Sequence, residues 1–313
     1  MSQALSFHAL PWFDQPLAEL MARYDHGQFP QSLLMLGEQG IGKQQFAEDV
    51  AQSMLCLNRT HHEPCGQCQS CVWLKRGNHP DYLAVMTEEK SQVIKIDQIR
   101  QLIQFAQMTS ETGRKVIVIH NADEMNVNAA NALLKTLEEP TPNCYLILVS
   151  NYPKKLPITI TSRCQRLPLT LHDTALAFDW LCQALPNTAP YIIEQAMALS
   201  YNRPLQAQAL LAGDGLDTVT TLQKQFAKFV QQPIYNSELV EIITKNWALA
   251  SHAIHLWLSQ ALKGQGNIAG LNAIAPQKLM ELYDAFIRLM HLSDTTVKQE
   301  WLIQDWLTKF VTP

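Results

Sequence analysis

The segment 37–43 constrains the fold more than any other part of the sequence. It reads Gly-Glu-Gln-Gly-Ile-Gly-Lys, follows a short apolar run at 32–36, and precedes a stretch with helical spacing of apolar residues that reaches Leu57. A glycine-rich turn between a buried strand and a helix is typical of a phosphate-binding loop, because glycines let backbone N–H groups close around an anion. The pattern predicts an α/β fold with this turn at the carboxyl end of the first strand.

Strand-like and helical segments alternate as far as about residue 169. The run 116–119 is apolar throughout, as buried parallel strands are, and we expect this strand to begin at Lys115. We therefore expect a five-stranded parallel sheet with helices on both faces. The predicted strands are 32–36, 81–86, 115–119, 145–149 and 165–169, and the predicted helices between them include 44–57, a helix capped by Asp97, and 126–139.

Beyond about residue 171 the strand-like runs stop, and the apolar residues follow helical spacing between proline- and glycine-containing breaks. This change predicts three parts: an α/β domain over 1–169, a small helical domain over 170–212, and an all-helical domain over 213–313. The helical segments expected here are 174–184, 191–200, 217–231, 237–261 and 276–292.

Charge and composition narrow the function. The formal net charge is −4 and the sequence pI is about 6.2, whereas a protein that binds nucleic acid alone usually has a basic excess. We expect any DNA contact to be local or shared with other subunits. The first 15 residues do not resemble a signal peptide, and no apolar run approaches the ~20 residues of a membrane span, so a cytoplasmic location is expected.

The phosphate loop departs from an active one at two positions that handle metal. Gln44 stands where a Ser or Thr would hold Mg²⁺, and His120 follows the third strand where an acidic residue is expected. Asp123 and Glu124 could replace it only if that strand ran longer. We expect Gly37, Gly40, Gly42 and Lys43 to form a phosphate loop that either binds ATP without hydrolysing it or remains only as a fold-defining turn.

Four cysteines lie close together, Cys56, Cys65, Cys68 and Cys71. In a chain without a secretion signal, such a cluster indicates a metal site rather than disulfides. Four thiolates suit a closed tetrahedral Zn²⁺ site, and an iron–sulfur cluster is the main alternative. Three histidines near the cysteines could also act as ligands: His61, His62 and His79.

Two further segments resemble a known family. The helix at 131–140, Asn-Ala-Leu-Leu-Lys-Thr-Leu-Glu-Glu-Pro, and the element Thr-Ser-Arg-Cys at 161–164 are similar to motifs of the AAA+ clamp-loader subunits of bacterial DNA polymerase III. The resemblance covers residues 1 to about 170. It implies an AAA+ P-loop domain with an inserted zinc module at about 56–71, followed by a helical lid and a helical collar.

The resemblance also implies partners and a role for one arginine. Because the catalytic positions are altered, it favours the delta-prime type of subunit, a stator without catalysis of its own. Such a subunit joins motor (gamma/tau) and delta subunits in a ring that loads the sliding clamp onto primed DNA. Arg163 matches the family's arginine finger, which completes the ATP site of a neighbouring motor subunit and can stabilise the transferred phosphoryl group. The cysteine cluster then implies structural Zn²⁺.

Two other functions remain open at this level. An active motor subunit of the same ring would have to tolerate Gln44 and His120, and it would hydrolyse ATP with magnesium. A stand-alone zinc-containing DNA-binding protein would bind DNA by itself with a strong salt dependence. The acidic net charge disfavours the second alternative.

Overall fold

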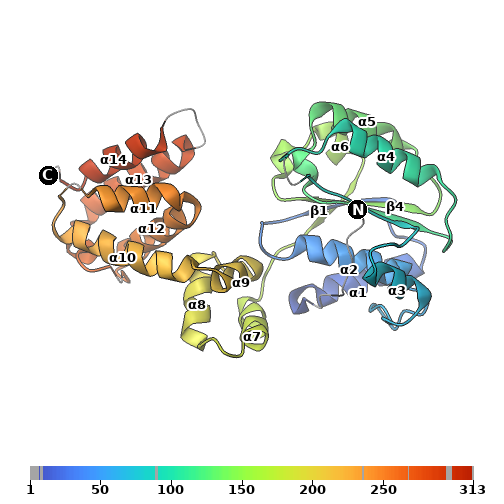
Figure 1. The fold of residues 1–313 in the computed structure, drawn as a ribbon, viewed down its shortest axis with the longest axis horizontal. Coiled ribbons are helices and arrows are strands. Elements are labelled where there is room, and N and C mark those ends of the chain that lie inside the picture. Colours follow the sequence, from blue (N-terminus) through green and yellow to red (C-terminus); the bar gives the residue numbers. More distant parts are fainter. Residues whose placement is uncertain are drawn as a thin grey trace. The chain divides into compact units, whose positions relative to one another are not determined.

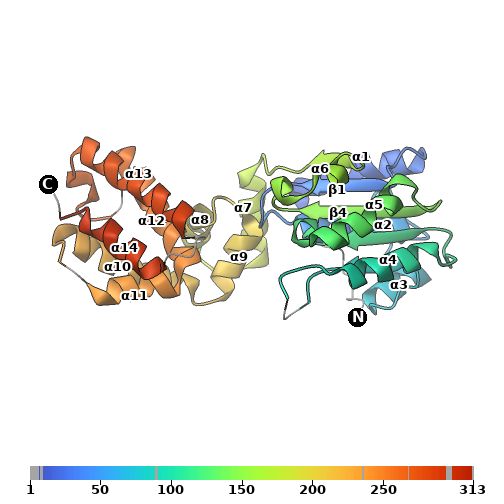
Figure 2. The same ribbon diagram turned by 90° about the horizontal axis from the view of Figure 1, so that it is seen from above.

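The computed structural model describes residues 7, 10–88, 91–234, 236–266, 268–293 and 298–311. The chain divides into two compact units, Met1–Trp180 and Leu181–Pro313. Figures 1 and 2 show both in two directions. The predicted division at residues 169 and 212 remains a prediction. Within the described ranges, no helix is both long and apolar enough to cross a bilayer.

The first unit contains a five-stranded sheet in the order β2-β3-β4-β1-β5, and every pairing between neighbours is parallel. The predicted α/β fold is confirmed, and each strand lies within one residue of its expected bounds. The strands are β1 Ser32–Leu36, β2 Tyr82–Val85, β3 Lys115–Ile119, β4 Cys144–Ser150 and β5 Gln165–Pro168.

Helices cover both faces of this sheet (Figure 1). On one face, Leu34, Ile117 and Leu146 share a buried cluster with residues of α4 and α5. The other face is covered by α1 to α3, as expected when successive strand residues point to opposite sides. These helices are α1 Asp14–Asp25, α2 Lys43–Leu55, α3 Gln69–Lys75, α4 Ile96–Gln107, α5 Val127–Glu138 and α6 Ile158–Thr161, and the short 3-10 turns are η1 Pro11–Phe13, η2 Ala122–Glu124 and η3 Pro153–Lys155.

The start of α4 differs from the expectation. Asp97 is not its cap, because the helix begins at Ile96 and Lys95 precedes it. The Lys95 N–H donates to Gln98 Oε1 at 2.9 Å, which gives the helix one half of a capping box. Asp97 instead lies in the first turn, where its carboxylate pairs with Arg100 at 2.9 Å.

The second unit is helical, as predicted, and its core is aromatic. The Phe226 ring stacks on Trp257 and Trp306, and Trp306 Nε1 donates to Leu282 O at 3.0 Å. One predicted helix, 237–261, is two helices that are broken at Asn246. The side-chain Nδ2 of Asn246 donates to Ile242 O at 3.1 Å. The helices are α8 Pro190–Leu199, α9 Pro204–Ala212, α10 Gly215–Gln231, α11 Ser237–Lys245, α12 Trp247–Leu262, α13 Pro276–Leu292 and α14 Gln299–Thr308, with η4 at Leu271–Ala273; α7, Thr174–Ala184, spans the boundary between the units.

Candidate functional site

The carboxyl ends of β1, β3 and β4 meet at one edge of the sheet. The chain leaves β1 into α2 on one face, whereas it leaves β4 toward α6 on the other. Parallel α/β sheets bind ligands at such a switch point, because the two connections diverge and open a crevice. The predicted phosphate loop, residues 37–43, lies at this edge.

The glycines of the loop serve different purposes. Gly40 and Gly42 have φ of 87° and 96°, a left-handed conformation that a side chain would strain. Gly37 lacks that conformation, but a Cβ there would lie 2.3 Å from the Leu169 carbonyl oxygen. Two glycines therefore shape the turn, and the third allows the backbone that follows β5 to pass close to the loop.

Lys43 is turned into the protein rather than toward solvent. Its side chain is buried, and the ammonium donates to Glu38 O at 2.6 Å and to Asn151 Oδ1 at 2.7 Å. Asn151 directly follows β4, next to β1 in the sheet. The cation that a working phosphate loop directs at its ligand is here bound by groups of the chain itself.

Side-chain amides extend the hydrogen bonds of Lys43 to the place where an active phosphate loop would hold magnesium. Gln44 Nε2 donates to Asn121 Oδ1 at 2.9 Å, and Asn151 Nδ2 donates to the same oxygen at 3.0 Å. We call Lys43, Gln44, Asn121 and Asn151 the amide network. Its geometry was not foreseen from the sequence, although both asparagines lie just beyond strands that end at the sheet edge where the loop lies.

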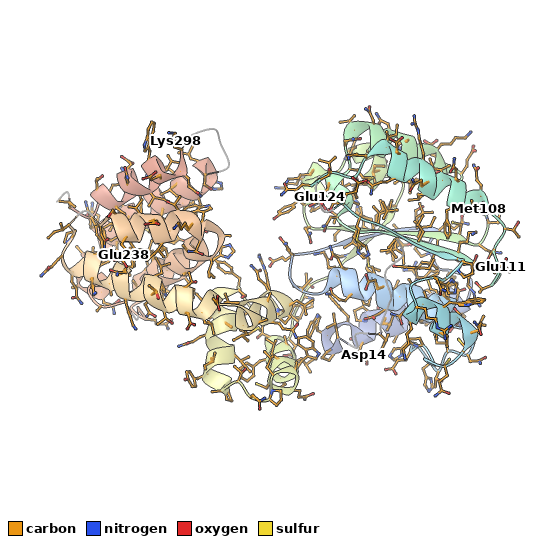
Figure 3. The ribbon with its side chains drawn as sticks, viewed as in Figure 1. Asp14, Met108, Glu111, Glu124, Glu238 and Lys298 are labelled. Atoms are coloured by element: carbon orange, nitrogen blue, oxygen red, sulfur yellow. The ribbon has the colours of Figure 1, made fainter. Side chains whose placement is uncertain are left out.

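His120 takes the acidic position beside the network but is itself buried. Its ring nitrogens have no hydrogen-bond partner in the described part of the chain, and Nε2 lies 3.4 Å from Glu48 Oε1. Burial lowers the pKa of His120 to about 4, so the ring is neutral near pH 7. β3 ends at Ile119 as predicted, which leaves Asp123 and Glu124 in η2 (Glu124 is labelled in Figure 3).

Arg163 lies just past α6, in the segment before β5. Its Nε and Nη2 both donate to Glu138 Oε1, the former at 2.7 Å, and its Nη1 donates to Thr159 O at 2.8 Å. The Arg163 side chain is 32% exposed and that of Glu138 is 48% exposed. The guanidinium is thus held from two elements and still reaches the surface.

The four cysteines come together around the end of α2 and the start of α3. Their sulfur atoms all lie within 4.8 Å of one another, and the Cys56 and Cys68 sulfurs are 3.9 Å apart. Zn–S bonds of about 2.3 Å in a tetrahedron place sulfurs about 3.8 Å apart, so the donor set fits this ion. The backbone N–H groups of Cys65, Cys68 and Cys71 point at sulfurs of the cluster at 3.3–3.5 Å.

The histidines suggested as alternative ligands do not join the cluster. His79 is buried between Ser70 Oγ, 2.8 Å from its Nε2, and the Asp81 N–H, 3.0 Å from its Nδ1. His62 instead binds Asp14 Oδ1 at 2.8 Å at the start of α1, which Figure 3 labels. The cluster in the described part of the chain therefore consists of the four cysteine sulfurs, and their role as metal ligands stays a prediction.

The comparisons with known proteins identify the family of the chain. The model of the family described as "DNA polymerase III, delta subunit" matches residues 14–172. A Pseudomonas aeruginosa protein described as DNA polymerase III subunit delta' is 38% identical over 74% of this chain and 70% of its own length. An Escherichia coli protein of the same description is 28% identical over 96% of this chain and 94% of its own.

A solved structure of a DNA polymerase III gamma subunit-related protein from Thermotoga maritima covers 94% of this chain and 98% of that chain, with 17% identity and a TM-score of 0.47. The relatives confirm the subunit type that the altered phosphate loop and the two sequence motifs predicted. On the strength of the family match and these relatives, the chain belongs to the delta' subunit family of DNA polymerase III.

Proposed function

We propose that this chain works in a clamp-loader complex as a stator subunit that does not hydrolyse ATP and that supplies Arg163 to the ATP site of a neighbouring motor subunit. The observation that carries the first part is the bond from Lys43 to Asn151. Relatives described as DNA polymerase III subunit tau and tau/gamma support a place among such subunits.

The amide network explains why hydrolysis is not expected. Phosphoryl transfer needs a positioned Mg²⁺ and an oriented water, and both rely on oxygen ligands near the loop. Gln44 directs its N–H toward Asn121 where a hydroxyl would meet the metal, and His120 is neutral where a carboxylate would. The phosphates of a nucleotide would also have to compete with Asn151 and the Glu38 carbonyl for the Lys43 ammonium.

Arg163 is suited to act on another chain. A guanidinium is always charged at physiological pH and can bind phosphate oxygens with two parallel N–H groups. The Arg163 side chain is partly exposed, and its described contacts do not use all its donors. Supplied across an interface, it would make hydrolysis by the neighbour depend on assembly, because that ATP site is complete only in the ring.

The cysteine cluster would hold structural Zn²⁺ through Cys56, Cys65, Cys68 and Cys71. The ion would supply a cross-link between the end of α2 and the start of α3, around the loop 57–64. Four thiolates leave no open position for a catalytic water, which supports a structural role.

The same role sets the partners that we propose. They are motor (gamma/tau) subunits and a delta subunit, with the sliding clamp and primed DNA contacted through the assembled ring. A cytoplasmic location follows from this role. The net charge of −4 favours DNA contacts made by the complex over DNA binding by the isolated chain.

The test is ATP hydrolysis by the reconstituted ring in the presence of clamp and primed DNA. We expect Arg163→Ala to assemble normally and to lower the stimulated rate about 100-fold, since a finger acts on transition-state charge. Arg166→Ala, which removes an exposed arginine three residues away, is the matched control. An unchanged rate in the Arg163→Ala ring would remove the finger role.

The two alternatives fail or survive in simpler assays. The isolated chain with Mg²⁺ and ATP should release no phosphate above background, and magnesium-dependent turnover would favour the motor-subunit alternative. The isolated chain should also bind a primed DNA only weakly at 150 mM salt. Tight binding with a steep salt slope would favour the stand-alone DNA-binding alternative.

A further inference from the structure

We propose that Glu138 is a positioning residue for Arg163: it holds the guanidinium in one orientation so that its remaining donors face a neighbouring subunit's phosphate. This inference rests on the proposed finger role and adds a residue that the sequence motif did not assign to it. It starts from the contacts around Arg163, which come from α5 on one side and α6 on the other.

Some N–H donors of Arg163 bond to its own chain, and the others remain for a ligand. A guanidinium has five N–H groups. Glu138 Oε1 accepts one from Nε and one from Nη2, and the Thr159 carbonyl accepts one from Nη1. These bonds leave one N–H on each terminal nitrogen. Two donors on neighbouring nitrogens can meet two phosphate oxygens in the parallel geometry that arginine prefers.

The groups that hold Arg163 are themselves anchored. Glu138 is the last residue of α5 and follows Leu137, while Thr159 precedes Ile160 in α6. Leu137 and Ile160 belong to the same buried cluster, which packs α4 and α5 against one face of the sheet. The acceptors on both sides of the guanidinium are therefore one residue away from the packed core, so their positions are well defined.

The exposure of the pair indicates what the bond is for. Exposed ion pairs add little to folding stability, since water solvates both partners and salt screens them. A flexible arginine would lose rotamer freedom each time it met phosphate, and a carboxylate that fixes it beforehand reduces that loss. The physical role that fits this pair is orientation of the side chain rather than support of the fold.

A carboxylate that competes with phosphate would have the opposite effect from one that orients the arginine. If Glu138 mainly sequestered Arg163, its removal would release the finger and raise hydrolysis by the ring. If it positions Arg163, its removal lowers the turnover rate and leaves the neighbour's ATP affinity unchanged, because the ground-state contacts of ATP lie in the other subunit. The sign of the change separates the two.

The experiment measures stimulated ATP hydrolysis by rings that carry wild-type chain, Glu138→Ala, Arg163→Ala or the double variant. We expect Glu138→Ala to lower kcat about fivefold with an unchanged KM for ATP, and Glu138→Gln, which keeps an acceptor oxygen, to recover part of the loss. The double variant should match Arg163→Ala, since Glu138 acts only through that side chain. Glu139→Gln, the adjacent exposed carboxylate, is the control and should match wild type.

The outcomes separate this inference from the function on which it rests. If Arg163→Ala has no effect, the proposed finger role fails and the inference fails with it. If Arg163→Ala slows the ring while Glu138→Ala leaves it unchanged or faster, only the inference is overturned. A double variant slower than Arg163→Ala would also overturn it, because Glu138 would then act by another route.

Discussion

The ammonium of Lys43 lies 2.7 Å from the side-chain oxygen of Asn151, so the cation of the phosphate loop is already bound by the residue that follows the neighbouring strand β4. A net hydrogen bond to a charged group contributes about 1.5–3 kcal/mol, and a phosphate must compete with it. We predict that Asn151→Ala raises the affinity for ATP about tenfold, since 1.4 kcal/mol corresponds to a factor of ten.

Titration calorimetry with ATP would check this prediction, and Asn78→Ala, an exposed asparagine elsewhere in the unit, is the control. No hydrolysis should accompany the tighter binding, because Gln44 and His120 are unchanged. Equal affinity of Asn151→Ala and wild type would contradict the view that the lysine is held back by its partner.

The cysteine cluster predicts one zinc ion per chain. Cys68→Ser should lose most of the metal, because three sulfurs and a poorer oxygen donor remain. Elemental analysis of purified protein measures the stoichiometry, and Co²⁺ substitution should give the strong thiolate-to-metal absorption of a four-sulfur site. Cys182→Ser, outside the cluster, should keep the full content. Iron with labile sulfide in the wild type would instead favour the iron–sulfur alternative.

Two buried histidines predict a loss of stability in mild acid. Burial lowers the pKa of both His79 and His120 to about 4, against an ordinary value of 6.5. Between these values the unfolded chain binds protons that the folded chain does not. The free energy of unfolding therefore falls as pH decreases from about 6.5 to 4, by up to about 1.4 kcal/mol per pH unit for each histidine.

Pulsed hydrogen exchange of β3 amides across a urea titration at pH 7, 6 and 5 would measure this slope for the first unit alone. His120→Gln should flatten the slope whatever its effect at pH 7. His61→Asn is the control, since His61 is exposed and has a φ of 54°, which asparagine tolerates. A slope unaffected by His120→Gln would show that this ring titrates normally in the folded chain.

The buried pair Asp81–Lys115 predicts a large cost for an unbalanced change. The Lys115 ammonium lies 3.5 Å from Asp81 Oδ1, with both side chains almost fully buried. Burial raises the pKa of Asp81, but hydrogen bonds from Thr112 and Glu111 outweigh it and the pKa falls. Asp81→Ala should lower the free energy of unfolding by about 3 kcal/mol or more, because it leaves a buried cation without its partner.

The same β3 exchange measurement detects this change. The double variant Asp81→Ala/Lys115→Met should recover part of the loss, since no uncompensated charge remains. Asp97→Ala breaks an exposed pair with Arg100 and should cost no more than about 0.5 kcal/mol. If Asp81→Ala cost as little as Asp97→Ala, the pair would not be a buried electrostatic contact.

The sequence predicted the strands well because their signal is local. After Lys115, residues 116–119 are all apolar and β-branched, and the run is too short for a helix, so the strand 115–119 could be predicted from the sequence. Helix ends were less certain: Asp97 is a good cap by residue type, yet the cap position is Lys95, two residues earlier, and its N–H pairs with Gln98. At Asn246 the backbone leaves the helical region, with φ of −118° and ψ of 34°, and the Asn246 side chain shares the Ile242 carbonyl with its own N–H. Apolar spacing reports neither feature.

The candidate site likewise has a part that local sequence predicted and a part that it did not. The cysteines are close in sequence, so their spacing predicted the cluster that the structure shows. The amide network joins residues up to 108 positions apart, and Glu138 meets Arg163 across 25. Such pairings depend on which strands are neighbours and on how the helices pack. A local sequence pattern predicts neither. Whether Arg163 acts on another chain stays a prediction.

Gly37 of the phosphate loop has a purpose that does not depend on nucleotide. Any side chain there would collide with the Leu169 carbonyl, whether or not a nucleotide is ever bound. That glycine is thus required by the route of the main chain, so folding alone requires it even in a chain that hydrolyses no nucleotide. A match to the glycine pattern of such loops therefore indicates the fold rather than an activity. Catalysis is indicated instead by the neighbouring residues whose side-chain oxygens would bind the metal and orient the water.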